Sequence, residues 1–428
     1  MADTNGTTII SSASGPLDPE RSLAFVRRFA LGRGAAVLGM QIVSVAVGWY
    51  LYDRTGDPWK LGLVGLVEVV PVILLLIPSG VVSDRFARRD VGIAATLVAA
   101  LAVVGLAAAT ARAAPLWLVY ACLALVGVSR AFGQPASSSY VPELMAPEER
   151  PRLNALIAAS YEAAAILGPV TAGLLIALTH GAAVPLGLAA LGQLGFVIAL
   201  LTLPRRAPHA DPDAVHSPRD LLAGVRFIRG MPVFLAAITL DLLAVLLAGS
   251  IALLPVYAKD ILHVGPAGLG WLRTAPSLGG LLMSLAATRM KPWERPGRVL
   301  LLAVAGFGLA TIGFGLSRSF WLSMAFLFLV SLFDMISVIV RITLEQNLTP
   351  DRIRGRVSAI NFVFVGLSNE LGAFESGAVA ALIGPIATVV GGGIAAVAVV
   401  LAVARVWPQL AAIGPLHTLA PPDQDPQP

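Results

Sequence analysis

The chain has 428 residues, of which 57% are hydrophobic and 13% are charged, and its formal net charge is +5. This composition excludes a soluble globular protein and indicates a polytopic membrane protein. It gives no support for nucleic-acid binding, because the arginines occur in short clusters between apolar runs, without interleaved aromatic residues. The single cysteine, Cys122, excludes an intramolecular disulfide and a cysteine-rich metal site.

Twelve apolar runs have the length of about 20 residues that a helix needs to cross a hydrocarbon core of about 30 Å. The alternating pattern of membrane strands is absent, so each run predicts a transmembrane helix. The predicted fold is an all-α membrane protein whose twelve spans cover approximately residues 24–51, 61–82, 90–111, 115–136, 152–179, 183–203, 232–258, 267–288, 298–317, 320–345, 357–383 and 386–406.

Lysine and arginine residues are concentrated on one side of this predicted membrane protein. They occupy the N-terminal segment and the loops that follow the even-numbered spans. Under the positive-inside rule, this distribution predicts that both termini are cytoplasmic. We therefore expect a multi-pass protein of the inner (plasma) membrane that contacts the lipid bilayer and is a monomer.

An internal duplication divides the chain into two halves. The segment that begins at Met145 recurs at Leu348, so that Pro147 matches Pro350. A repeat of about half the chain predicts two pseudo-symmetric six-helix bundles around a central site near the membrane midplane. The predicted organisation is a disordered tail over 1–22, bundles over 23–203 and 232–407, a cytoplasmic linker over 204–231 and a second disordered tail over 408–428.

The loop between the second and third predicted spans carries a charged motif. It combines one glycine, one aspartate and three arginines, which are Gly80, Asp84, Arg85, Arg88 and Arg89. The motif resembles the signature of the major facilitator superfamily. The glycine permits close helix approach, and the arginines face cytoplasmic headgroups and helix ends.

A second resemblance lies in the fifth predicted span. Gly168, Pro169 and Gly173 are similar to a glycine-proline element of antiporters in this superfamily, and they predict a bendable, tightly packed helix. The surrounding residues 129–156 resemble the drug exporter branch, which includes macrolide and siderophore exporters. Over residues 25–407 the resemblance implies alternating access and proton-coupled efflux of an amphipathic drug, macrolide-like or siderophore-like molecule.

Ionisable residues inside the predicted spans mark candidate sites, because a charge there costs about 2.5–3.5 kcal/mol on insertion scales. Arg130 resembles an arginine that exporters of this superfamily carry in a motif linked to proton transfer. Asp334 occupies the equivalent place in the second half, 204 residues later, so the two residues could pair across a cavity or flank a ligand. Glu162 and Asp241 are the predicted proton-coupling acids, because a buried carboxyl near an arginine can exchange a proton near neutral pH. Two further acids in spans join this predicted group, namely Glu68 and Glu370.

Other polar residues in the spans have weaker predicted roles. Arg341 and Glu345 are four residues apart, and we interpret them as a salt bridge at a helix end. Four residues are candidates for lining a polar cavity, namely Gln41, Trp271, Arg273 and Asn361.

The sequence has no zinc-ligand spacing, phosphate-binding loop or nucleophile elbow. We therefore expect no enzymatic activity, no metal and no cofactor, and the expected partners are protons and a small-molecule substrate. Two alternatives stay open. One is a flippase or uptake facilitator for lysophospholipids or other lipid-like substrates, and the other is a membrane sensor or assembly partner that transports nothing.

Overall fold

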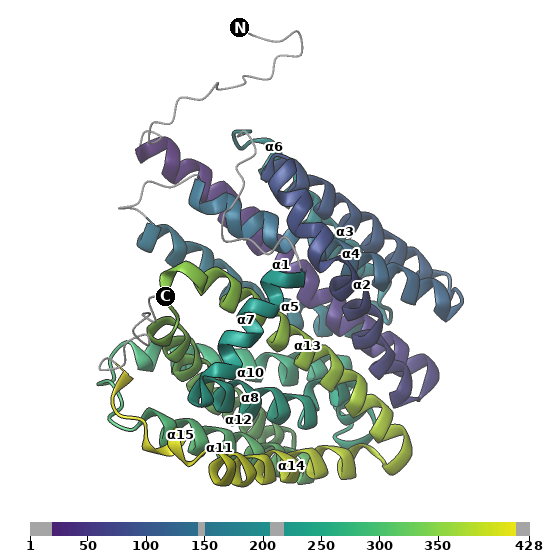
Figure 1. Cartoon of the computed structure of the whole chain (residues 1–428). Helices are drawn as coiled ribbons and strands as arrows, with labels where there is room; N and C mark the ends of the chain where they lie inside the picture. Colours follow the sequence, from purple (N-terminus) through teal and green to yellow (C-terminus); the bar gives the residue numbers. More distant parts are fainter. Residues whose placement is uncertain (1–18, 144–149, 206–217, 417–428) are drawn as a thin grey trace, which may run out of the picture. The chain divides into compact units, whose positions relative to one another are not determined.

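The computed structural model describes residues 19–143, 150–205 and 218–416, which are almost entirely helical (Figure 1). Four segments lie outside the described residues, namely 1–18, 144–149, 206–217 and 417–428. They include most of both predicted tails, part of the predicted linker and the beginning of the duplicated segment at Met145. The helices in chain order are α1 (Pro19–Thr55), α2 (Pro58–Arg85), α3 (Arg88–Ala111), α4 (Leu116–Glu143), α5 (Arg150–Thr179), α6 (Ala183–Leu201), α7 (Pro218–Gly230), α8 (Pro232–Leu247), α9 (Leu254–Val256), α10 (Gly265–Ala287), α11 (Pro296–Leu316), α12 (Phe320–Leu348), α13 (Asp351–Ile383), α14 (Pro385–Val406) and α15 (Pro408–Ala412).

The all-α membrane fold is confirmed, since eleven predicted spans each coincide with one helix and the seventh coincides with a series of helical segments. Within the described residues, eleven helical segments are long and apolar enough to cross a membrane. The remaining predicted span corresponds to α10, whose 23 residues include an arginine, two prolines and several glycines that lower its hydropathy. The count of twelve spans and the cytoplasmic location of the termini stay predictions.

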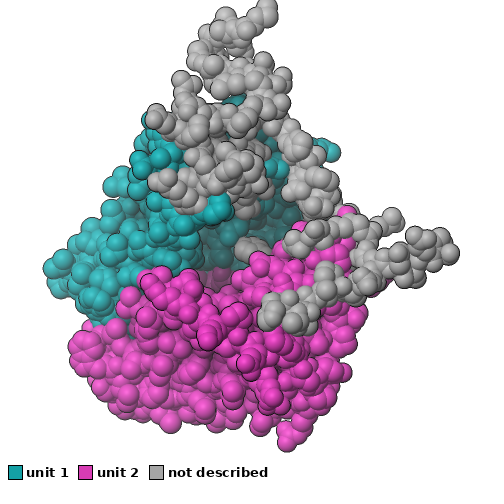
Figure 2. All heavy atoms as spheres, turned by 90° about the vertical axis from the view of Figure 1, so that its left-hand side faces the viewer, with its two compact units in different colours: residues 1–54, 67–212, 265–274 teal, residues 55–66, 213–264, 275–428 magenta. Residues whose placement is uncertain are grey.

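The chain forms two compact units, which Figure 2 shows in different colours. Unit 1 contains residues 1–54, 67–212 and 265–274, and unit 2 contains residues 55–66, 213–264 and 275–428. The first turns of α2 belong to unit 2 and the first turns of α10 belong to unit 1. The predicted division into two six-helix bundles stays a prediction.

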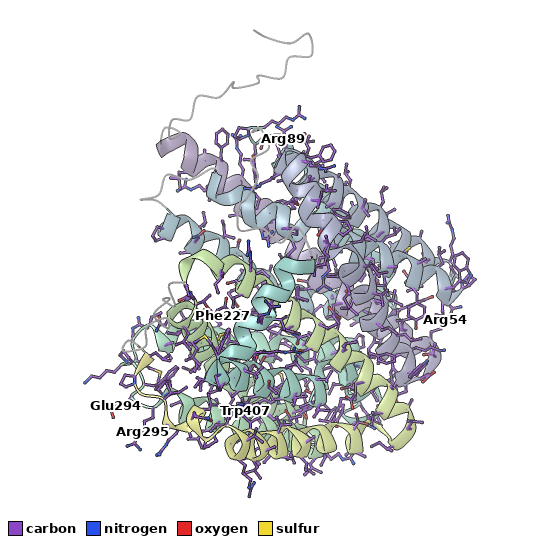
Figure 3. All side chains as sticks on the ribbon, in the orientation of Figure 1. Arg54, Arg89, Phe227, Glu294, Arg295 and Trp407 are labelled. Carbon is purple, nitrogen blue, oxygen red and sulfur yellow. The ribbon has the colours of Figure 1, made fainter. Side chains whose placement is uncertain are left out.

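Unit 1 is held together by apolar packing and by side chains that bond to neighbouring backbones. Ser129 in α4 donates to the carbonyl of Ala95 in α3 at 2.8 Å, and Gln193 in α6 donates to that of Ala36 in α1 at 3.0 Å. Polar side chains in a span need such internal partners, because hydrocarbon offers none. Arg54 and Arg89 lie at opposite ends of this unit (Figure 3).

Unit 2 has a core in which α8, α11, α12, α13 and α14 contribute buried side chains such as Phe234, Val304 and Val340. The short helix α7, inside the predicted linker, packs its apolar face on this core through the buried Ile228, while Arg226 and Arg229 are exposed. The helix α15 lies where the second tail was predicted to begin.

The seventh predicted span, 232–258, is interrupted. Helix α8 ends at Leu247, and the chain continues as a 3₁₀ turn (Ser250–Leu253), the short α9 and a π-helical turn (Tyr257–Ile261). Glycine is a poor helix former, and Gly249 lies at the break. Pro255 lacks the N–H that would bond to the carbonyl of Ile251, and the N–H of Leu254 bonds to that carbonyl instead.

Candidate functional site

A buried ion pair within the spans of unit 2 joins α8 to α12. Nη2 of Arg341 lies 2.8 Å from Oδ1 of Asp241, and the two side chains are only 6% and 7% exposed. Ser337, one turn before Arg341, donates a long hydrogen bond of 3.4 Å to Asp241 and accepts one of 3.4 Å from Nε of Arg341. In soluble proteins, removal of one member of such a buried pair costs about 3–5 kcal/mol, because the other charge is left without compensation.

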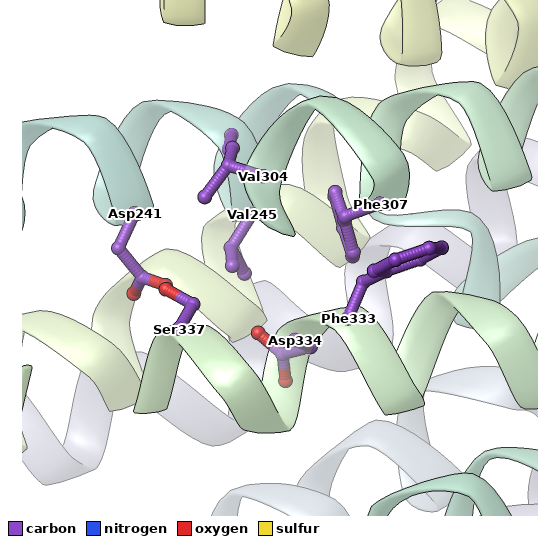
Figure 4. Close-up of a pocket in the computed structure, with 8 residues that line it drawn as sticks. Asp241, Val245, Val304, Phe307, Phe333, Asp334 and Ser337 are labelled. Atoms are coloured by element: carbon purple, nitrogen blue, oxygen red, sulfur yellow. The ribbon is translucent and has the colours of Figure 1, made fainter. Parts of the chain in front are cut away.

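Asp334 lies on the same pocket as this ion pair. The pocket is small, with a cavity volume of about 10 Å³, and Figure 4 shows the side chains of Asp241 and Ser337 close together, with Asp334 nearby on α12. Its remaining lining is apolar and consists of Ala244, Val245, Val304, Phe307 and Phe333. Asp334 is within electrostatic range of Asp241 and Arg341. Among the described residues it has no hydrogen-bond or ion-pair partner.

The cluster of Asp241, Asp334 and Arg341 therefore sets two carboxyl groups against one guanidinium. If Asp241 and Asp334 were both ionised, the apolar pocket would carry an uncompensated negative charge, which is costly in a medium of low dielectric constant. Proton uptake removes that charge. The cluster is thus suited to exchanging one proton while it keeps the Asp241–Arg341 pair.

Unit 1 contains a different ion pair. Nη1 of Arg130 in α4 lies 2.9 Å from Oε2 of Glu68 in α2. The Arg130 side chain is 46% exposed, in contrast to the buried Arg341. Charged groups within spans rarely face lipid, so we expect the exposed part of Arg130 to face water or polar groups.

Other predicted site residues of unit 1 lie on α1, α5 and α10. Nη2 of Arg273, in the first turns of α10, donates to Oγ of Ser44 at 2.7 Å, and Trp271 is 45% exposed. Gln41 packs against Gly168, where an added Cβ would lie 2.6 Å from Cβ of Gln41. Glu162 in α5 is half-buried.

The glycine-proline element of α5 makes close helix contacts. A Cβ at Gly173 would collide with the carbonyl of Pro266 in α10, and one at Gly270 would lie 2.5 Å from the carbonyl of Pro169. The predicted tight packing of this helix is therefore present.

The charged motif covers the last turns of α2 and the first turn of α3. Arg89 donates from Nη1 to the carbonyl of Leu203 at 2.6 Å, and Asp90 pairs with Arg205 at 2.8 Å, which attaches this loop to the end of α6. Ala87, directly before α3, has a φ of −58°, which alanine readily adopts. The side chain of Asp84 lies outside the described residues.

One interpretation from the sequence, the salt bridge between Arg341 and Glu345, is wrong. Arg341 pairs with Asp241 and not with Glu345, because it faces α8. Glu345 instead accepts hydrogen bonds from Ser358 and from Asn361, the latter at 2.7 Å, near the end of α12. Asn361 is thus engaged there. The partners Ser44 and Ser337 were missed, although Ser337 is three residues after Asp334 and shares its face of α12.

Glu370 lies half-buried in α13. Its carbonyl oxygen would be 2.5 Å from a Cβ added at Gly65, so α2 and α13 approach closely there. No group of three His, Cys, Asp or Glu side chains is placed to hold a metal ion in the part of the chain that the structure describes.

Comparison with known proteins agrees with this architecture. Residues 29–373 match the sequence family Major Facilitator Superfamily. The enterobactin exporters EntS of Shigella boydii serotype 18 and Escherichia coli O1:K1 are each 27% identical over 363 residues, which cover 85% of this chain and 86% of theirs.

Solved transporter structures share the fold. A point mutant of the peptide transporter POT has a TM-score of 0.73 at 13% identity and covers 94% of this chain and 100% of its own. The nucleoside transporter NupG has a TM-score of 0.71 at 13% identity and covers 90% and 99%. The family match covers most of the chain, and the chain therefore belongs to the major facilitator superfamily, as a multi-pass transporter of the inner membrane and not an enzyme.

Proposed function

We propose that this transporter exports a siderophore-like amphipathic small molecule in exchange for protons. The observation that carries the proposal is the cluster of Asp241, Arg341 and Asp334, in which two carboxyl groups share one guanidinium beside an apolar pocket. A buried, charge-imbalanced group of this kind is a functional site by default in a membrane protein.

The relatives support the direction of transport and the substrate class. Two of them carry the name enterobactin exporter, and the similarity extends over 85% of this chain. An identity of 27% leaves room for another siderophore or for a different amphipathic molecule, so the expected substrate is a class of molecules and not one compound.

The geometry suggests how proton exchange could be linked to helix movement. With Asp334 protonated, Arg341 is committed to Asp241, which ties α12 to α8. Loss of the Asp334 proton creates a second negative group on the pocket, and Arg341 is then drawn from Asp241 towards Asp334. The proton therefore changes the strength of the α8–α12 contact, and a ligand or proton shifts a conformational equilibrium only through such a difference between states.

The test is a transport assay in inside-out membrane vesicles with an acidified interior. Addition of enterobactin or a hydroxamate siderophore should release protons from the vesicles, as reported by a pH-sensitive dye, and the siderophore should accumulate inside. Asp334→Asn should abolish both signals, and Glu294→Gln, an exposed acid outside the spans, should retain them.

Other results would redirect the assignment. Accumulation that persists after the pH gradient is collapsed would contradict proton coupling. Movement of a fluorescent lysophospholipid, without movement of any siderophore, would favour a lipid-like substrate. A wild-type phenotype that survives neutralisation of Glu162, Asp241 and Asp334 would favour a role without transport.

A further inference from the structure

Exposed charged residues are unequally distributed between the two ends of the helices of unit 2. On the side where α11 begins, and among the described residues, the exposed charges within three positions of a helix end are one acid, Glu294, and five arginines, namely Arg229, Arg289, Arg295, Arg298 and Arg405. On the side where α11 ends, the same count over the described residues gives Arg318 and Asp260. The first end is therefore strongly basic, and it is the end that the positive-inside rule predicts to be cytoplasmic.

Helices α11 and α14 of unit 2 pack against each other in a regular register. A Cβ at Gly315 would lie 2.8 Å from Cγ2 of Val390, and one at Gly308 would lie 2.9 Å from Cγ2 of Val397. A step of seven residues back along α11 thus matches a step of seven residues forward along α14, so the two helices are antiparallel neighbours.

This register brings two of the arginines to the same level. Continued by ten residues, it places Arg298 of α11 level with Trp407, two residues after Arg405 of α14. A contact at this end agrees with it, because a Cβ at Gly297 would collide with the carbonyl of Leu410 in α15. Arg298 and Arg405 are therefore long side chains on adjacent helices at one end of unit 2.

Neither of these two guanidinium groups is neutralised by a neighbour among the described residues. Arg298 and Arg405 are exposed, and their side chains have no hydrogen-bond or ion-pair partner there. Two like charges on adjacent helices repel each other, and an anion bound between them reduces that repulsion. The planar fork of a guanidinium matches the oxygens of a phosphate group.

Each arginine continues an apolar stripe on the outer side of its helix. Leu302, four residues after Arg298, is 71% exposed, and Leu309 is exposed seven residues later. Leu401, four residues before Arg405, is 54% exposed. Spacings of four and seven place side chains on one face of a helix. The face that carries the two arginines is therefore apolar along the spans, as is expected where lipid acyl chains are in contact.

Two tryptophans mark the level of the membrane interface at this end. Trp407 directly follows the span of α14, and Trp293 lies three residues before the span of α11. Both are partly buried against the apolar core of unit 2. Because tryptophan is enriched at the boundary between acyl chains and headgroups, we expect Arg298 and Arg405 to lie at the level of the phospholipid headgroups.

We propose that Arg298 and Arg405 bind the phosphate of an anionic phospholipid whose acyl chains lie along Leu302, Leu309 and Leu401. Basic sites between membrane helices on the cytoplasmic side suit such headgroups. A zwitterionic headgroup carries a cation of its own, which the two arginines repel, so the site prefers a lipid with net negative charge. The site lies on the outer surface of unit 2, and the inference does not depend on the proposed function.

Native mass spectrometry of the full chain in neutral maltoside micelles tests the site. The protein is titrated with phosphatidylglycerol and with phosphatidylcholine of identical acyl chains, and the affinity of the first bound lipid is measured. We expect phosphatidylglycerol to bind more tightly, and Arg298→Gln and Arg405→Gln should each weaken its binding about fivefold, which corresponds to about 1 kcal/mol per arginine. Arg298→Lys keeps the charge and should retain most of the affinity. The matched control Arg318→Gln, just beyond the other end of α11, should have no effect.

Three results would overturn the inference. Equal affinity of the wild type for the two lipids, or unchanged binding of phosphatidylglycerol by the double variant, would leave the arginines as topology signals. Displacement of the lipid by inorganic phosphate, which has no acyl chains, would indicate a site for free anions. A dimer that the double variant dissociates, measured by light scattering, would mean that a second copy of the chain covers this face.

A control separates loss of binding from loss of folding. Each variant must elute as wild type in size-exclusion chromatography. If one does not, the wild type decides the question at raised ammonium acetate concentration, because salt screens a contact between exposed arginines and a phosphate. The preference for phosphatidylglycerol should then decrease, and a preference that salt does not change would contradict the inference.

Discussion

Arg341 of α12 is bound to Asp241 of α8 at 2.8 Å, whereas Asp334, two turns earlier on α12, has no hydrogen-bond or ion-pair partner among the described residues. The three groups therefore differ in what each contributes. The paired residues hold two helices together, and Asp334 supplies a carboxyl group whose charge depends on a proton.

This difference predicts the effect of Asp334→Asn. The amide mimics the protonated acid, so the variant should fold with wild-type stability and still bind substrate, because the Asp241–Arg341 pair is kept. Transport driven by the pH gradient should fall to background, while exchange of labelled for unlabelled substrate continues. Retained pH-driven uptake by inside-out vesicles would show that the coupling acid is elsewhere, and Glu162→Gln is the variant to measure beside it.

The ion pair itself should be structural as well as functional. Asp241→Leu or Arg341→Met alone should destabilise the protein by about 3–5 kcal/mol, because each leaves one buried charge without its partner. The double variant should recover most of the melting temperature, measured by fluorescence-detected size-exclusion chromatography, yet remain inactive in transport. Ser337→Ala removes only the two long hydrogen bonds and should have a smaller effect. A double variant no more stable than the single ones would contradict this account.

The Glu68–Arg130 pair should behave differently, because Arg130 is half-exposed. Single neutralising substitutions, Glu68→Gln and Arg130→Gln, should change stability modestly, and a double-mutant cycle should give a coupling energy of about 0.5–3 kcal/mol. A coupling energy of zero would mean that the two side chains do not stabilise each other.

The contact between α2 and α13 predicts a steric effect. A Cβ at Gly377 would lie 2.5 Å from Cα of Gly62, so Gly377→Ala should separate the helices and cost about 1–3 kcal/mol, as overpacking does. Gly366 lies in the same helix, and a Cβ there would meet nothing within 4 Å. Gly366→Ala is therefore a matched control that should be neutral or stabilising, and a comparable loss of melting temperature in both variants would refute the packing argument.

The predicted orientation can be measured by cysteine labelling. Cys122 is buried and is the only cysteine, so Cys122→Ser provides a background for single cysteines. Arg112→Cys, in the loop after α3, should react with a membrane-impermeant maleimide in intact cells, and Arg405→Cys, at the end of α14, should react only after permeabilisation. The reverse pattern would place the termini outside.

Much of the fold follows from the sequence because the membrane requires long apolar helices. The predicted spans coincide with helices for that reason, and the glycine-proline element packs closely as expected. The interruption after Leu247 was not predicted, since apolarity alone continues through Gly249 and Pro255 and carries no signal of backbone breaks.

The candidate site was less predictable. The duplication puts Arg130 and Asp334 at equivalent positions, but their contacts come from residues that the repeat does not relate. Arg130 meets Glu68 of the second span, and Asp334 shares a pocket with Asp241 of the seventh. Which side of each helix faces a neighbour depends on tertiary packing, and a single sequence does not specify it.

The interruption in the seventh span has a mechanical consequence. With 16 residues, α8 is about 24 Å long, which is short of the membrane thickness of about 30 Å. The piece that follows is anchored separately, since Tyr257 stacks on Phe314 at 4.5 Å and donates to the carbonyl of Gly315 in α11 at 3.1 Å. The break at Gly249 separates α8, which carries Asp241, from the segment that Tyr257 anchors to α11. Helix α8 can therefore change its tilt while the second half of the same membrane crossing stays in place.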